Sequence, residues 1–90
     1  MEDMDDIRTP AQEDARTEAA VLRWLLHLHP VQVTFEELLR EISEDPEDFV
    51  QRDAIDRAVR DLVTAGLAHR NGEFVVPSRA ALRLDELLGD

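Results

Sequence analysis

The spacing of hydrophobic residues predicts a helix followed by a β-hairpin in the second half of the chain. One apolar position recurs every three or four residues after Asp53, which predicts a helix with one buried face. Gly66 can adopt the left-handed conformation that ends a helix. Asn71-Gly72 is a pair preferred in two-residue hairpin turns, which predicts a hairpin over residues 68–77. The helical repeat comprises Ile55, Ala58, Val59 and Leu62.

The first half of the chain predicts a helix from Ala11 to His29 that is apolar on two sides. One stripe comprises Ala15, Ala19, Leu22 and Leu26, and the second comprises Val21, Trp24, Leu25 and Leu28. Both apolar sides of this helix must be buried, and in so small a domain the second side could pack against another copy of the chain. The expected homodimer interface comprises Val21, Trp24, Leu28 and Leu82. The alternative is that Trp24 packs beneath the last helix of its own chain.

Two shorter elements are predicted between these helices. The alternating residues 31–33 are consistent with an edge strand that pairs with the hairpin. Thr34 and Glu37 have the spacing of a capping box, which predicts a second helix running to about Ile42. In the connection over residues 43–52, we expect a short turn that holds Phe49 and Val50 against the core.

A last helix is predicted from Arg79 to about Leu88, with Ser78 as its cap and Gly89 as its stop. Its expected inner face comprises Ala80, Ala81, Leu84, Leu87 and Leu88, and Leu82 lies off that face. This helix either closes the core of the monomer or supports a dimer.

The fold class that follows is mainly α with a small β-hairpin (α+β), in one domain over residues 11–90. Residues 1–10 are acidic and show no periodicity, which predicts a disordered arm. Such an arm either keeps the protein soluble or folds over a basic surface and competes with an anionic ligand.

Charge is distributed unevenly along the chain, whose net charge is -11. Residues 1–50 hold four arginines and fourteen acidic residues, whereas residues 51–84 hold six arginines and four acidic residues. Only the segment with the predicted central helix and hairpin is therefore basic.

The composition argues against several classes of protein. The chain has no cysteine, lysine or tyrosine and no glycine-rich phosphate loop, so we expect neither an enzyme nor a cofactor. We expect no metal site, because His27 and His29 would point apart on a helix and the acidic residues 44–48 lack the ligand spacing of a calcium loop. No apolar run is long enough to span a membrane, so the expected location is the cytoplasm.

The order of these elements resembles the winged-helix DNA-binding domain of small bacterial transcription regulators. The resemblance covers about residues 12–88, and its most specific part is Leu62-Val63-Thr64-Ala65-Gly66-Leu67 leading into the hairpin. The resemblance implies a winged helix-turn-helix fold that binds double-stranded DNA. By position, the recognition helix would carry Arg52, Arg57, Arg60 and Thr64, and the wing would carry Arg70 and Asn71.

Two functions follow for the central helix. In a regulator, Arg57 and Arg60 would reach guanine edges or phosphates, and Arg52 and Arg70 would meet the DNA backbone. The alternative is a winged-helix adaptor that binds a protein through the apolar Trp24 surface and an acidic face, and binds no nucleic acid. The spacings Asp53–Arg57, Asp56–Arg60 and Arg57–Asp61 also suit ordinary ion pairs along a helix, which is the alternative to DNA contact for these arginines.

Overall fold

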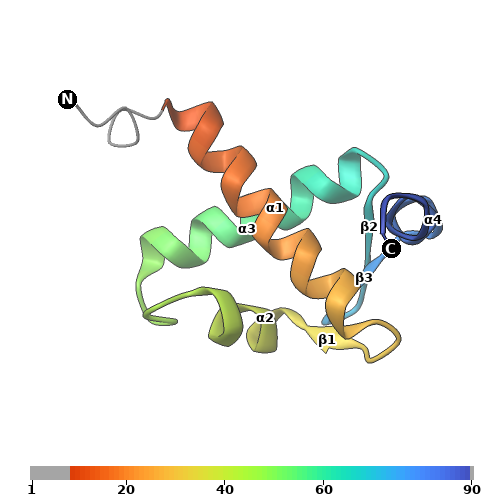
Figure 1. Cartoon of the computed structure of the whole chain (residues 1–90). Coiled ribbons are helices and arrows are strands. Elements are labelled where there is room, and N and C mark those ends of the chain that lie inside the picture. Colours follow the sequence, from red (N-terminus) through yellow and green to blue (C-terminus); the bar gives the residue numbers. More distant parts are fainter. Residues whose placement is uncertain (1–8, 90) are drawn as a thin grey trace.

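The structure is a computed structural model that describes residues 9–89. Within that range it is a mainly α-helical domain with a small antiparallel sheet (Figure 1), as the sequence predicts. The elements are α1 (Pro10–Leu28), β1 (Val33–Thr34), α2 (Phe35–Ile42), α3 (Phe49–Thr64), β2 (Ala68–Asn71), β3 (Phe74–Pro77) and α4 (Arg79–Leu88). The first eight residues of the predicted arm lie outside the described range.

Helix starts are set by local hydrogen bonds. The predicted capping box of α2 is present: the hydroxyl of Thr34 accepts from the backbone N–H of Glu37, and the Glu37 carboxylate accepts from the N–H of Thr34. A second box joins Thr9 and Gln12 at the start of α1, so residues 9 and 10 of the predicted arm belong to the folded domain. Ser78 caps α4 as predicted.

Helix α3 begins at Phe49, four residues earlier than expected. Asp48 caps it by accepting from the backbone N–H of Val50, and the connection from α2 spans only residues 43–48. The expectation that Phe49 and Val50 pack on the core is wrong, since both are exposed. On α3, the buried Ile55 and the half-buried Gln51 are four residues apart and therefore lie on the same, inward side. Phe49 and Val50 precede Gln51 and lie on the outward side of the helix.

The hairpin forms as predicted, but its turn is shifted by one residue. Asn71 pairs with Phe74, so the two loop residues are Gly72 and Glu73 and not Asn71-Gly72. Gly72 has φ +63° and no non-glycine residue in the described chain has positive φ, which matches a turn with glycine at its first central position. Gly66, with φ +82°, follows the end of α3 as expected.

Strand β3 lies between β2 and β1 and joins the hairpin to the start of α2. Val75 pairs with Arg70 on one side and with Val33 on the other, so the predicted pairing of the edge strand with the hairpin is confirmed. The backbone N–H of Phe35 donates to the carbonyl oxygen of Glu73 at 2.9 Å. These bonds hold the hairpin against the first turn of α2.

The core forms where α1 crosses α3, with α2 and β3 closing it (Figure 1). Its largest fully buried side chains are Val21, Leu25, Leu38, Leu39, Val59 and Val75. The second stripe of α1 is therefore the inner one. The prediction that Val21 lies in a dimer interface is wrong, because this side chain is completely buried within its own chain.

Helix α4 docks on the core through its first turn alone. Ser78 and Ala81 are buried and Leu82 is half-buried, and the backbone N–H of Ser78 donates to the carbonyl oxygen of Leu67. The inner face expected for this helix is wrong over its second half, where Leu84, Leu87 and Leu88 are exposed. Only the first turn of α4 packs on the core, so these leucines lie beyond it and are exposed. No helix of the described range has the length and apolar character needed to cross a bilayer.

Two valines of α3 test this arrangement of the core. Val59 is 0% exposed and Val50 is 77% exposed. We expect Val59→Ala to lower the free energy of unfolding by about 2–3 kcal/mol, since it removes two buried methyl groups and leaves a cavity. Val50→Ala should change it by less than about 0.5 kcal/mol. Urea unfolding of both variants measures the difference, and similar losses would contradict the orientation of α3.

Candidate functional site

Phe35 brings together two of the arginines that the sequence assigns to DNA. Its ring lies between α3 and the hairpin, with the guanidinium carbon of Arg52 at 5.9 Å and that of Arg70 at 5.0 Å from the ring centroid. Both distances suit cation–π contacts. The capping box at Thr34 and the hydrogen bond to Glu73 hold the Phe35 backbone in place. An arginine of α3 and an arginine of β2 are thus positioned on one face of the molecule.

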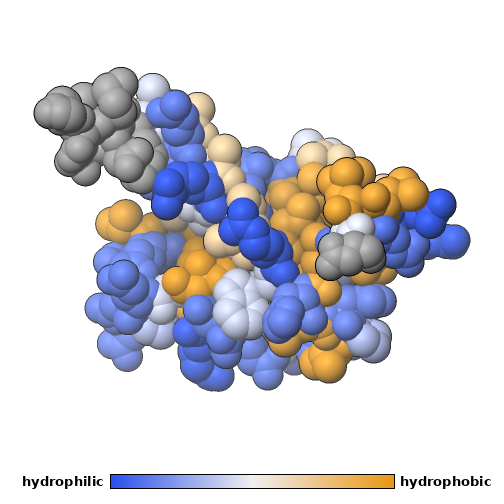
Figure 2. Space-filling model, in the orientation of Figure 1, coloured by the Kyte–Doolittle hydropathy of each residue, from blue (hydrophilic) through white to orange (hydrophobic). Residues whose placement is uncertain are grey.

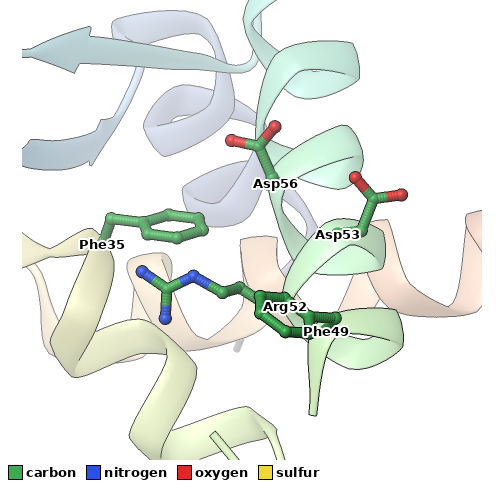
Figure 3. A pocket seen from close by; sticks show the side chains of 5 residues that line it. All are labelled: Phe35, Phe49, Arg52, Asp53 and Asp56. Carbon is green, nitrogen blue, oxygen red and sulfur yellow. The ribbon is translucent and has the colours of Figure 1, made fainter. Parts of the chain in front are cut away.

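A pocket of about 380 Å³ opens beside this ring. Figure 3 shows Arg52 reaching from α3 toward Phe35, while Asp53 and Asp56 lie farther along the helix. Phe49 completes the lining. The pocket therefore combines two aromatic rings with a cation and two carboxylates, and it belongs to the exposed face of α3.

Each arginine of α3 is paired with a carboxylate. Arg52 contacts Glu36 at 2.6 Å, and Arg60 contacts Asp56 at 3.0 Å. Arg57 contacts Asp53 at 2.7 Å and Asp14 of α1 at 3.3 Å. The expected pairs Asp53–Arg57 and Asp56–Arg60 are thus present, whereas Arg57 turns to Asp14 and not to Asp61.

These ion pairs are weak because they are solvated. The side chains that form them are between 41% and 65% exposed. Pairs of this kind typically contribute between zero and about 1 kcal/mol each. An anionic ligand could therefore displace the carboxylates at small cost. The four arginines Arg52, Arg57, Arg60 and Arg70 are matched in number by the carboxylates of Asp14, Glu36, Asp53 and Asp56, and Asp61 of α3 and Glu73 of the hairpin are exposed nearby in the sequence.

The two remaining predicted site residues, Thr64 and Asn71, lie toward opposite ends of strand β2. Thr64 is exposed at the end of α3, just before the hairpin begins, whereas Asn71 is exposed at the far end of β2. The hairpin turn lies beside β1, away from the end of α3 (Figure 1). Thr64 therefore does not join the group around Phe35, while Asn71 borders it.

Sequence reasoning missed Phe35, Glu36 and Asp14 as parts of this face. Phe35 packs on the core with 9% of its surface exposed. The two acids contact arginines 16 and 43 residues away in the chain. No local pattern reports contacts over such separations, since they depend on how α1 and α2 pack on α3.

A cluster of carboxylates lies between α1 and α3. Burial raises the pKa of Glu18, and a side-chain hydrogen bond to Asp61 together with the negative charges of Asp61 and Asp14 raises this pKa further. Within residues 9–89, no group of three or more such side chains is arranged to hold a metal ion.

Three comparisons with known proteins were made. Neither a protein-family model, nor a curated protein, nor a solved structure matches the chain.

Removal of the Glu18 carboxylate is expected to stabilise the protein at neutral pH. A raised pKa means that the folded chain binds the proton more tightly than the unfolded chain does, so the ionised form opposes folding. This penalty is absent below the ordinary pKa of 4.5 and grows as the pH rises through the folded-state value. We expect Glu18→Gln to raise the melting temperature at pH 7 and to have little effect near pH 4.

The matched control is Glu41→Gln, which removes the same charge from an exposed position on α2. Thermal unfolding by circular dichroism at both pH values compares the variants. An equal gain from both at pH 7 would assign the effect to net charge and contradict the role of the carboxylate cluster.

Proposed function

We propose that this chain is a winged-helix transcription regulator that binds double-stranded DNA through α3 and the β2–β3 hairpin. The observation that carries the proposal is the meeting of Arg52 and Arg70 over Phe35. Contact with one ring brings guanidinium groups from the helix and the hairpin near each other, which would suit simultaneous contact with a groove and its flanking backbone. In the resemblance to winged-helix regulators, α3 is the recognition helix and the hairpin is the wing.

Each arginine has a distinct role in this proposal. Arg57 and Arg60 lie on the exposed side of α3 and would contact guanine edges or phosphates in the major groove, while Arg52 and Arg70 would contact the backbone on either side. The ion pairs of Arg52, Arg57 and Arg60 would give way to phosphate, because each exposed pair is worth no more than about 1 kcal/mol. Thr64 and Asn71 are the polar residues at the margins of this surface.

Salt dependence tests the proposal directly. Four arginine–phosphate contacts predict a slope of about -3.6 for the logarithm of the binding constant against the logarithm of salt concentration. Arg57→Ala combined with Arg60→Ala should halve this slope and weaken binding. Fluorescence anisotropy with a labelled random-sequence duplex measures both quantities. Absence of binding at low salt would overturn the proposal.

The control for this experiment is Arg16→Ala combined with Arg23→Ala. These arginines are exposed on α1, and the pair removes the same charge as the test pair. An equal loss of affinity from the control would mean that overall charge, and not the face of α3, determines binding.

Neutralising the carboxylates of α3 should strengthen DNA binding. Asp53 and Asp56 hold Arg57 and Arg60 and would also repel phosphate. We expect Asp53→Asn combined with Asp56→Asn to raise affinity by about tenfold, which corresponds to about 1.4 kcal/mol. Glu41→Gln combined with Glu44→Gln removes the same charge elsewhere and serves as the control in the same anisotropy assay. Unchanged affinity in the Asp53 and Asp56 variant would contradict the assigned docking face.

A second candidate function is a winged-helix adaptor that binds a protein partner and no nucleic acid. The observation that favours it is that each arginine of α3 is already paired with a carboxylate, within a chain of net charge -11. Paired arginines and aspartates at that face suit a polar protein interface as well as a solvated surface. This function would explain a failure of the wild-type chain and of the Asp53 and Asp56 variant to bind DNA at low salt.

A further inference from the structure

Helix α4 exposes a leucine stripe, which we define as Leu84, Leu87 and Leu88. Their exposed fractions are 49%, 62% and 78%. Spacings of three and four residues place them on one side of the helix, in line with the exposed Ala80. Figure 2 shows the hydrophobic area over α4, extending toward α1. The outward side of this helix, where a solvated helix carries polar residues, is thus apolar.

The size of the leucine stripe makes it more than a scatter of surface residues. Three leucines at these exposures leave an apolar area on the order of a few hundred Å², comparable to the largest apolar patch on a typical monomer, which is often functional. The stripe also lies at the edge of the domain, because only the first turn of α4 packs on the core. A second surface can therefore approach it without displacing any element of the fold.

The charges of α4 are arranged along its length. Arg79 and Arg83 occupy the first half, and Asp85 and Glu86 occupy the second half. Arg83 contacts Glu86 at 3.1 Å, and both side chains are 67% exposed. When two such helices lie antiparallel, the basic half of each meets the acidic half of the other. The helix is thus complementary to a reversed copy of itself, as a two-fold symmetric interface requires.

We propose that the leucine stripe is a homodimer interface in which two copies of α4 pack antiparallel about a two-fold axis near Leu84. The occupant is a second copy of this chain because the described charges of α4 sum to zero, whereas the rest of the chain is strongly acidic. A basic partner would be drawn to the acidic surface elsewhere. The leucine stripe is apolar and α4 has no net charge, so both match a second copy of α4 that runs in the opposite direction.

This interface differs from the one that the sequence predicts. Val21 is buried in the core, and Leu82 is half-buried on the other side of α4 from the leucine stripe. Trp24 and Leu28 are half-buried against their own core, and their part in a dimer stays a prediction. The proposed interface leaves the exposed face of α3 free, so it does not rest on DNA binding.

Sedimentation equilibrium of the full chain over a range of concentrations tests the proposal. The wild-type chain is expected to dimerise, and Leu87→Glu is expected to raise the dimer dissociation constant by at least about a hundredfold, because a two-fold interface buries the new charge twice. The matched control is Val50→Glu, which places the same charge on an apolar residue exposed at the start of α3. It should dimerise like the wild type.

Three results would overturn the proposal: a wild-type chain that remains monomeric at millimolar concentration, a Leu87→Glu variant that dimerises normally, or an equal loss in Val50→Glu. Circular dichroism shows in each case whether the variant is folded. Since these measurements contain no DNA, their outcome is separate from that of the proposed function.

The absence of cysteine from the chain allows the direction of the helices to be tested. An axis near Leu84 places residue 80 of one copy beside residue 88 of the other. A mixture of Ala80→Cys and Leu88→Cys chains should therefore form a disulfide-linked heterodimer on mild oxidation, and neither chain alone should cross-link efficiently. Efficient cross-linking of Ala80→Cys with itself would mean parallel helices and would overturn the antiparallel arrangement.

Discussion

The packing of α1 across α3 is the interaction on which the rest of the structure depends. Val21 and Leu25 of α1 and Val59 of α3 have almost no exposed surface, and α2 and β3 complete the same core. A chain of 90 residues has few other apolar contacts with which to oppose its conformational entropy. Because this crossing sets the rotation of α3 about its axis, it also determines which side of α3 faces solvent and carries the arginines.

On the exposed side of α3, the positions of the arginines are fixed, whereas the ion pairs that neutralise them are weak. The ring of Phe35 orients Arg52 and Arg70, while carboxylates from α1, α2 and α3 neutralise the arginines of the helix. Since the ion pairs are solvated, the arginines can exchange them for contacts to the phosphates of a nucleic acid or keep them within a polar protein interface. The fold is therefore compatible with both proposed functions.

Local chemistry accounts for the predictions that the structure confirms. The capping box at Thr34, the cap at Ser78 and the left-handed Gly66 each depend on residues within one turn, so the sequence contains the whole interaction. The turn of the hairpin shows the limit of this approach. Asn71-Gly72 is a favourable pair, but the pairing of Asn71 with Phe74 moves the turn onward by one residue.

The sequence by itself determined the order of the elements, the caps of α2 and α4 and the arginines of the basic segment, because these follow from periodicity, capping and charge along the chain. Only the tertiary structure decided which faces are buried. It placed Val21 inside and Leu87 outside, and it joined Arg52 to Arg70 through Phe35 and Arg57 to Asp14. An apolar stripe indicates that one face of a helix is buried, whereas the element that buries it depends on the packing of segments far apart in the chain.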